Sequence, residues 1–236
     1  LTNMPWMPLI LIYGLIGFKI GGLKLSLTIV ASFLFITFTG VLPQALLSIY
    51  LCGIAVIISF ILGSSLGIWA AHNDKVSAFM RPINDTMQTM PSFVILIPFV
   101  MFFGIGEFTA LLAIIAYAFV PALRYTEHGL RNLPETVIEA AQMIGCSQTQ
   151  LLWKVKIPLA MPVIMLGLNQ TIMFGLAMLV IAALVGTTGL GQLIYIGLSK
   201  ADFGTGMISG VSIALIAIIF DRTTQAWRIK LEKKTQ

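Results

Sequence analysis

Residues 25–71 read LSLTIVASFLFITFTGVLPQALLSIYLCGIAVIISFILGSSLGIWAA and contain no Asp, Glu, Lys or Arg. A helix that crosses a membrane needs about 20 mostly apolar residues, so this stretch is long enough for two such helices. Gly40 and Pro43 interrupt it, and they predict one span near residues 25–42 and another near 45–71. The stretch therefore indicates a helical membrane protein.

The composition of the whole chain agrees with this interpretation. Of its 236 residues, 58% are hydrophobic and 10% are charged, and the mean hydropathy is +0.98. A soluble domain carries about 25% charged residues. The composition thus argues against a soluble enzyme or a nucleic-acid-binding protein, and it makes the lipid bilayer the expected surroundings. Cys52 and Cys146 form no CxxC motif and no disulfide framework.

Other uncharged stretches predict the remaining spans. They lie within residues 6–18, 86–106, 108–123, 157–199 and 203–220. We therefore expect an all-α integral membrane protein, a bundle of about seven transmembrane helices. Residues 1–42 hold the N-terminal helices of this expected bundle.

The basic residues predict the orientation of the bundle. If the C-terminus is cytoplasmic, every Lys and Arg except Lys200 falls on the cytoplasmic side, where basic residues are retained. Residues 229–236 then form a basic cytoplasmic tail, with no further domain expected after the last span. Seven spans would place the N-terminus outside.

The polar segment 124–156 has the sequence features of two short helices rather than of a simple loop. An N-cap pair, a glycine terminator and a second capping box predict the helix ends. They are formed by Asn132 with Glu135, by Gly145, and by Ser147 with Gln150. Pro158 marks the expected boundary with the next span. Two capped helices at the membrane surface favour a docking surface over a solvated face.

One motif in this segment is similar to that of a known family. Glu139, Ala140 and Ala141 are followed after three residues by Gly145, and nine residues later by Val155, then Ile157 and Pro158. This pattern resembles the EAA loop of the permease subunits of type I ABC importers, with Val and Ile at two positions where the family has Ile and Leu. The resemblance implies a type I ABC transmembrane domain at residues 43–228 with a cytoplasmic coupling loop at 124–157.

The resemblance also implies partners and residue roles. In the family the short helix docks into a cleft of a cytoplasmic ATP-binding-cassette ATPase subunit, so Ala140 and Ala141 would permit close approach and Glu139 would meet partner donors. Gly145 would set the turn, and Ile157 and Pro158 would complete the motif. A second permease copy, as a homodimer, and a substrate-binding protein are further implied partners, in a bacterial cytoplasmic membrane. This chain would hold no catalytic residue, metal or cofactor of its own, because ATP and Mg would bind to the ATPase.

Further stretches resemble the quaternary-ammonium branch of that family. They are residues 87–91, 169–171, 180–183, 189–192 and 219–225. The branch implies a betaine-like solute: glycine betaine, proline betaine, choline, carnitine or trimethylamine N-oxide. Polar groups inside spans and soft Met side chains make Met90, Pro91, Asn169 and Met173 the candidate residues of the translocation path. Because no acidic residue falls within the predicted spans, we expect a weakly binding path, with selection by the binding protein.

Three alternatives stay open. In the first, the chain is an ABC permease for another small solute, of amino acid or sulfonate type. In the second, it is an ion-coupled secondary transporter. A transporter of the second kind would need intramembrane ionisable residues or an inverted repeat, and neither is visible in the sequence. The third alternative is an intramembrane hydrolase, because residues 63–67, Gly-Ser-Ser-Leu-Gly, match the nucleophile pattern of hydrolases. They also match the GxxxG motif of packed membrane helices, which we favour because the stretch lies inside an apolar span.

Overall fold

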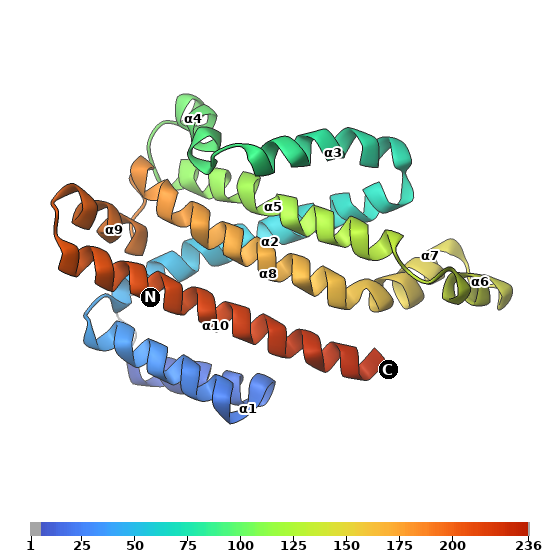
Figure 1. Ribbon diagram of the computed structural model, residues 1–236, viewed down its shortest axis with the longest axis horizontal. Coiled ribbons are helices and arrows are strands. Elements are labelled where there is room, and N and C mark those ends of the chain that lie inside the picture. The colour runs from blue at the N-terminus through green and yellow to red at the C-terminus, as the bar shows by residue number, and fades with distance from the viewer. Residues whose placement is uncertain (1–5, 236) are drawn as a thin grey trace.

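The computed structural model describes the backbone of residues 6–235 and the side chains of residues 7–231, and every element in this part of the chain is helical (Figure 1). The elements are α1 (Trp6–Phe38), α2 (Leu42–His72), α3 (Asp74–Thr89), α4 (Ser92–Phe103), α5 (Glu107–Arg131), α6 (Glu135–Met143), α7 (Gln148–Gln150), the π-helical η1 (Leu151–Lys156), α8 (Ile157–Ala182), the 3-10 helix η2 (Ala183–Val185), α9 (Leu190–Ser199) and α10 (Phe203–Thr235). Residues 1–5 and 236 of the predicted N-terminal region and basic tail lie outside the described residues.

The described chain has five helical stretches long and apolar enough to cross a membrane. They are Met7–Phe38, Leu42–His72, Glu107–Arg131, Gln148–Val185 and Phe203–Leu231. The pair α3 and α4, bent by 103° at their junction, makes a sixth if it is counted as one span. The prediction of an all-helical membrane bundle is confirmed, while the count falls from about seven to five or six.

The difference in count arises at two breaks. Helix α1 contains both of the first two predicted spans and is broken at Gly22, where φ is 77° and ψ is −165°. Its two limbs pack together: the Ser26 hydroxyl donates to the Gly14 carbonyl at 2.9 Å, and the Tyr13 and Phe33 rings stack at 5.2 Å. Each limb measures about 24 Å at 1.5 Å per residue, less than the hydrocarbon core of about 30 Å. The second break divides the predicted span 86–106 between α3 and α4.

The centre of the bundle is built on close contact between α2 and α5. A Cβ atom added to Gly63 would lie 2.5 Å from the Phe119 carbonyl oxygen, and one added to Gly67 would lie 2.7 Å from that of Leu123. The GxxxG interpretation of residues 63–67 is therefore confirmed, since only glycine permits this approach. Around this contact, α2, α5, α8 and α10 share a buried apolar core that includes Ala55, Ala113, Ile114, Leu179 and Ile216.

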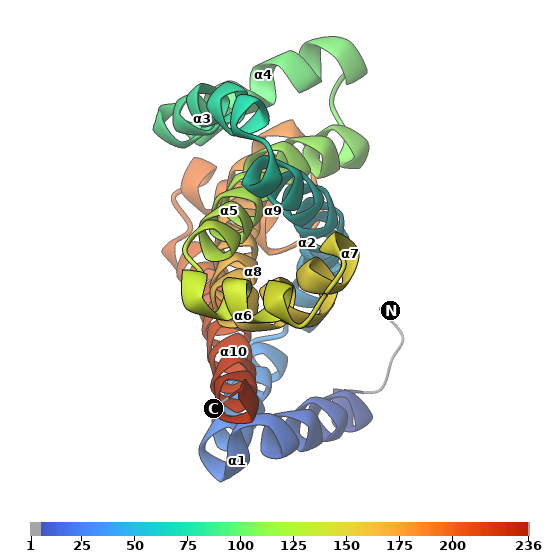
Figure 2. The ribbon, with the colours of Figure 1, turned by 90° about the vertical axis from the view of Figure 1, so that its right-hand side faces the viewer.

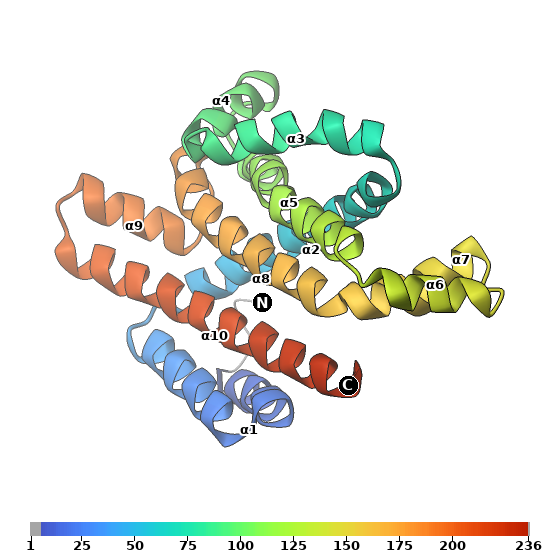
Figure 3. The ribbon, with the colours of Figure 1, turned by 45° about the vertical axis from the view of Figure 1, so that its right-hand side comes forward.

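The connections divide between two ends of the bundle. The α2–α3 connection, α6, α7 and the C-terminal end of α10 lie together at the right-hand end of Figure 1, and α4, α9 and the α1–α2 connection lie at the other. Figure 2 looks along the bundle from the α6–α7 end. Figure 3 shows α3 and α4 as an arm beside α5, outside the row formed by α5, α8 and α10.

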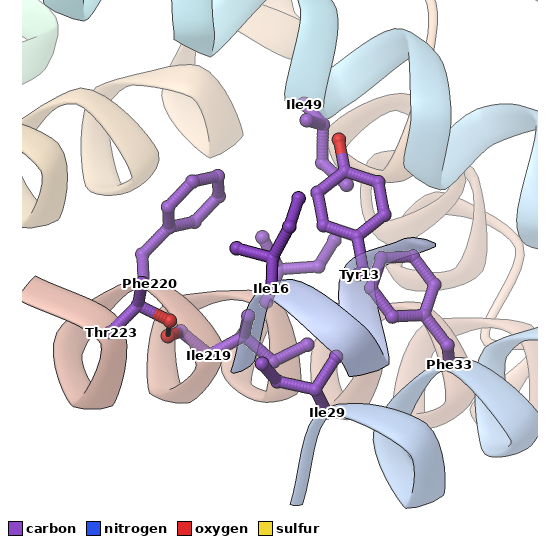
Figure 4. A pocket seen from close by; sticks show the side chains of 9 residues that line it. Tyr13, Ile16, Ile29, Phe33, Ile49, Ile219, Phe220 and Thr223 are labelled. Atoms are coloured by element: carbon purple, nitrogen blue, oxygen red, sulfur yellow. Dashed lines mark hydrogen bonds between the residues drawn. The ribbon is translucent and has the colours of Figure 1, made fainter. Parts of the chain in front are cut away.

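The α1 limbs leave an apolar cavity of about 110 Å³ against α2 and α10 (Figure 4). Its lining includes Tyr13, Ile29, Phe33, Ile219 and Thr223. The Thr223 hydroxyl donates to the Ile219 carbonyl of its own helix at 2.7 Å. The cavity therefore presents hydrocarbon and aromatic surface, and the polar residues predicted for a solute path lie elsewhere.

Candidate functional site

The predicted motif residues Glu139, Ala140 and Ala141 lie on α6, a short helix at the end of the bundle (Figure 1). Glu139 and Ala140 are exposed, and no residue of α6 is buried. The helix begins after Pro134, and the predicted N-cap pair of Asn132 with Glu135 is wrong. Asn132 ends α5 instead, where its side-chain amide donates to the His128 carbonyl at 2.9 Å.

Gly145 ends α6 as predicted. Its φ is +86°, in the left-handed region that glycine adopts without strain. The Gly145 amide donates to the Gln142 carbonyl at 2.9 Å, and the Cys146 amide donates to the Ala141 carbonyl at 3.3 Å. These two bonds form a complete Schellman motif, which satisfies the last carbonyls of the helix and turns the chain sharply.

The second half of the loop differs from the prediction. The capping box is present, with the Ser147 hydroxyl accepting from the Gln150 amide at 3.3 Å and the Gln150 side chain accepting from the Ser147 amide at 3.1 Å. However, α7 continues through η1 into α8 without a break, so Pro158 is no boundary. In η1 the Ile157 amide bonds the Leu152 carbonyl, five residues earlier. This shift in the hydrogen-bond pattern carries the helix past Pro158, which has no amide hydrogen to donate.

The two ends of the motif have different surroundings. Ile157 packs against the buried residues Leu130 and Ala160, while Pro158 is exposed. Apolar side chains around α6 are also exposed, with Met143 at 89% and Ile144 at 84% of their full accessible area. Trp153 on η1 adds to this surface. Clustered apolar surface of this kind is typical of a protein interface.

A charged network at the base of α6 was not foreseen from the sequence. The Arg131 guanidinium lies 3.1 Å from the Glu127 carboxylate and 2.8 Å from that of Asp74, and it donates to the Ala70 carbonyl at 2.8 Å. The Ser77 hydroxyl donates to Glu127 as well. The spacing of Glu127 and Arg131, four residues apart on a helix, is the signal that could have indicated this pair.

The predicted path residues lie in two separate places. Met90 and Pro91 form the corner between α3 and α4, where Met90 has extended backbone angles because a residue before proline disfavours the helical region. Two residues before Met90, Gln88 accepts a hydrogen bond from Arg124 of α5, and Arg124 also lies 2.9 Å from Asp85. Asn169 and Met173 lie one turn apart in the middle of α8.

Asn169 belongs to a polar cluster between α8 and α10. Only 8% of its area is exposed, its amide donates to Asp221 at 2.9 Å, and its carbonyl oxygen accepts from the Thr224 hydroxyl at 2.8 Å. The Gln225 amide donates to both Asp221 oxygens at 2.8 Å. Asn169, Asp221, Thr224 and Gln225 are called the polar cluster below.

Asp221 lies just beyond the last predicted span, yet it packs inside the bundle against α8. The last predicted span ended at Phe220, but α10 continues to Thr235, and its part from Asp221 on carries Arg222, Arg228 and Lys230. The sequence reasoning ended the span at the first charged residue. It could not show that helical contact with α8 continues beyond it.

The comparison with protein families identifies the architecture. The model of the family described as binding-protein-dependent transport system inner membrane component matches residues 63–227, more than half of the chain. The chain belongs to this family. The resemblance to ABC-importer permeases seen in the sequence is thereby confirmed, and the family description makes the chain a multi-pass component of an inner membrane.

Curated members of the permease family are similar over almost the whole chain. The glycine betaine/proline betaine transport system permease protein ProW of Escherichia coli is 39% identical over 96% of this chain, which covers 64% of that protein. The trimethylamine N-oxide transport system permease protein TmoV of Pelagibacter ubique is 42% identical over 95% of this chain and 31% of its own length. The glycine betaine transport system permease protein OpuAB of Bacillus subtilis is 37% identical over 100% of this chain and 84% of its own. The chain thus spans less than two thirds of the first two of these relatives.

Solved structures of family members share the fold. An inward-facing form of the MetNI methionine ABC transporter aligns with a TM-score of 0.72 at 18% identity, over 78% of this chain and 93% of that one. An amino acid ABC transporter crystallised with histidines gives a TM-score of 0.68 at 16% identity, over 83% and 98% of the two chains. At these identities the likeness shows the permease fold alone.

Proposed function

We propose that this chain is the membrane-spanning permease subunit of an ABC importer for a betaine-like compatible solute: glycine betaine, proline betaine, carnitine, choline or trimethylamine N-oxide. The EAA motif on the exposed helix α6 carries the proposal, because a permease needs such an element to receive force from an ATPase. The names of the relatives that are 37–42% identical over nearly the whole chain support the solute class.

In this proposal α6 is the coupling helix. Glu139 meets donors of the ATPase, Ala140 and Ala141 allow close approach, and Gly145 fixes the turn after the helix. Ile157, the first residue of α8, packs against the cluster of Leu130 and Ala160, and Pro158 beside it completes the motif. The exposed Met143, Ile144 and Trp153 support docking, since a partner would remove their apolar surface from water. A rigid α6 would then transmit closure of the ATPase to the bundle as a rigid-body movement.

The same geometry supports an orientation of the bundle in the membrane. Three segments with basic residues lie at the α6–α7 end of the bundle. They are the end of α5 with Arg131, η1 with Lys154 and Lys156, and the end of α10 with Arg228. Lys200 follows α9 at the opposite end. Because basic residues favour the cytoplasmic side, this division supports a cytoplasmic α6 and C-terminus.

The remaining partners are a second copy of the permease, forming a homodimer, and a substrate-binding protein. ATP and Mg would bind to the ATPase subunits and supply the energy. Met90 and Pro91 at the α3–α4 corner, with Asn169 and Met173 on α8, are proposed to line the path. The corner supports a path role, because irregular backbone at membrane depth is tolerated where it lines a cavity.

A permease for an amino acid is the second candidate, the alternative that the sequence leaves open. The test is uptake into proteoliposomes that contain this permease with its ATPase and its binding protein. We expect ATP-dependent uptake of labelled glycine betaine or another quaternary amine, and none of methionine. Uptake of amino acids alone would contradict the proposed solute class.

A further inference from the structure

The inference concerns a groove of about 520 Å³ that lies between α1 and α10. Lys24 of α1 and Arg222 of α10 both line it, and so do three apolar side chains, Leu25, Ile218 and Ile229. The groove shares no lining residue with the apolar cavity of Figure 4. It combines two basic groups with hydrocarbon surface, and it is called the basic groove below.

Close contacts between α1 and α10 fix the walls of the basic groove. A Cβ atom added to Gly21 would lie 3.2 Å from the Ala226 Cβ, so the two helices approach closely beside the break in α1. The Lys230 ammonium donates to the Lys19 carbonyl, which ties the same break to the last part of α10. Figure 3 shows α1 beside α10. The groove is thus a feature of the packed helices.

Both basic residues lie at the end of an uncharged helical segment. Residues 203–220 of α10 and residues 25–38 of α1 contain no Asp, Glu, Lys or Arg. About 28 Å of helix separates Phe203 from Arg222, close to the thickness of the hydrocarbon core, which is about 30 Å. Trp227, just beyond Arg222, is 50% exposed, and tryptophan is enriched where a membrane meets water. The basic groove therefore lies at the boundary between hydrocarbon and water.

The two basic groups of the groove have no acidic partner among the described residues. The side chains of Lys24 and Arg222 are exposed, and within residues 7–231 neither makes a hydrogen bond or an ion pair. Asp221 precedes Arg222 in the chain, but its carboxylate belongs to the polar cluster and accepts from Asn169 of α8. None of the described residues that line the groove is acidic. Both positive charges are thus left for an external anion.

An anionic phospholipid fits this arrangement. Its phosphate group would meet Lys24 and Arg222, and a guanidinium can bind phosphate through two parallel hydrogen bonds. Its acyl chains would run toward the centre of the membrane along Leu25 and Ile218, which lie on the hydrocarbon side of the two basic residues. A free phosphate ion would leave this apolar surface unused. A zwitterionic lipid would bring a positive group of its own to the two basic residues.

We propose that the basic groove binds an anionic phospholipid at the membrane surface, with Lys24 and Arg222 as the site of its headgroup. Basic pockets between membrane helices are typical sites for such headgroups. The bound lipid joins α1 to the rest of the bundle through α10, because its headgroup contacts both helices. The proposal rests on the membrane setting of the chain, and it is independent of the solute that the protein carries.

The test is a lipid titration of the purified protein in detergent, followed by native mass spectrometry. Phosphatidylglycerol is the probe, and phosphatidylcholine with the same acyl chains shows whether the negative charge is needed. The groove variant, Lys24→Gln with Arg222→Gln, removes both charges. The matched control, Lys75→Gln with Arg81→Gln, removes two exposed basic charges from α3, which does not line the groove.

We expect the wild type and the control to bind phosphatidylglycerol with similar affinity. The groove variant should bind it about twenty-five-fold more weakly, or about fivefold for each charge removed. Phosphatidylcholine should bind the wild type more weakly than phosphatidylglycerol does. A further variant, Lys24→Arg with Arg222→Lys, keeps both charges and should recover most of the affinity that the groove variant loses.

The proposal is overturned if the groove variant binds phosphatidylglycerol as tightly as the control does, or if phosphatidylcholine binds the wild type equally well. Displacement of the lipid by an equal concentration of inorganic phosphate would also overturn it, because the groove would then be a site for a free anion. Thermal unfolding without added lipid shows whether each variant is folded. If the groove variant does not fold, the two single substitutions replace it, and each should lose about fivefold in affinity.

Discussion

The Nε atom of Arg131 lies 3.1 Å from the Glu127 carboxylate, in the last turn of α5 before the chain leaves for α6. The same guanidinium reaches Asp74 and the Ala70 carbonyl, at the corner between α2 and α3. One side chain thus connects the base of α6 to two other helices. A displacement of α6 would be passed to the α2–α3 corner through these bonds.

We predict that Arg131→Gln destabilises the protein by about 1–3 kcal/mol, because Glu127 is then left without its charged partner in a largely buried position. The side chains of Arg131 and Glu127 are 29% and 12% exposed. Thermal unfolding in detergent measures the effect. Arg124→Gln is the control, since that ion pair is 45% and 60% exposed and should contribute at most about 1 kcal/mol. Equal unfolding temperatures for the two variants would contradict the account of the network.

The contact between α2 and α5 gives a second prediction. Gly67→Leu places a side chain where the Leu123 carbonyl oxygen and the Thr126 side chain already lie, and should destabilise the bundle by about 1–3 kcal/mol or prevent its assembly. Gly53→Leu, on the same helix, meets no atom within 4 Å of its Cβ and should be tolerated. The measurement is the yield of monodisperse protein and its unfolding temperature. If Gly67→Leu is as stable as Gly53→Leu, the helices are not in backbone contact there.

Asn169→Leu should reduce solute uptake while leaving binding of the ATPase intact. The substitution removes the hydrogen bonds to Asp221 and Thr224 and puts apolar bulk beside the carboxylate. Thr171→Val is the control, because the Thr171 hydroxyl bonds the Gly167 carbonyl of its own helix and should not affect uptake. Uptake in proteoliposomes, with copurification of the ATPase as the assembly check, measures both. Unchanged transport by Asn169→Leu would show that this residue is not part of the path.

Cys146 provides a test of the orientation. It follows Gly145 at the end of α6 and is partly exposed, whereas Cys52 is buried in α2. With the permease expressed alone, we predict that a membrane-impermeant maleimide labels Cys146 in inside-out vesicles and not in right-side-out vesicles. A Cys146→Ser variant should remain unlabelled in both. Labelling from the outer face would reverse the proposed topology.

Much of the fold could be predicted because local chemistry decides it. The uncharged stretches give the apolar helices, Gly145 gives the end of α6, and Gly63 and Gly67 give a close helix contact, although not its partner α5. These features depend on a few neighbouring residues and on the shortage of charge. The same is true of the EAA motif, whose spacing is visible in the sequence itself.

The features that were missed depend on contacts between distant residues. Asn132 could cap either of two helices, and only the structure shows that it ends α5. Pro158 looks like a boundary until η1 shifts the hydrogen bonds ahead of it. Asp221 looks like the first residue beyond the last span until its contact with Asn169, 52 residues earlier, places it inside the bundle.

The central claim is that α6 couples an ATPase to this permease, and its most direct test is ATP hydrolysis stimulated by the solute-loaded binding protein in the reconstituted complex. Gly145→Val forces a β-branched residue to φ +86°, at a strain of about 1–3 kcal/mol, and should displace the end of α6. Gly145→Asn is the matched control, because asparagine tolerates this conformation. The account predicts that Gly145→Val and Glu139→Lys lose the stimulated hydrolysis and the uptake, while Gly145→Asn keeps most of both. Normal stimulation and uptake in both Gly145→Val and Glu139→Lys would contradict it.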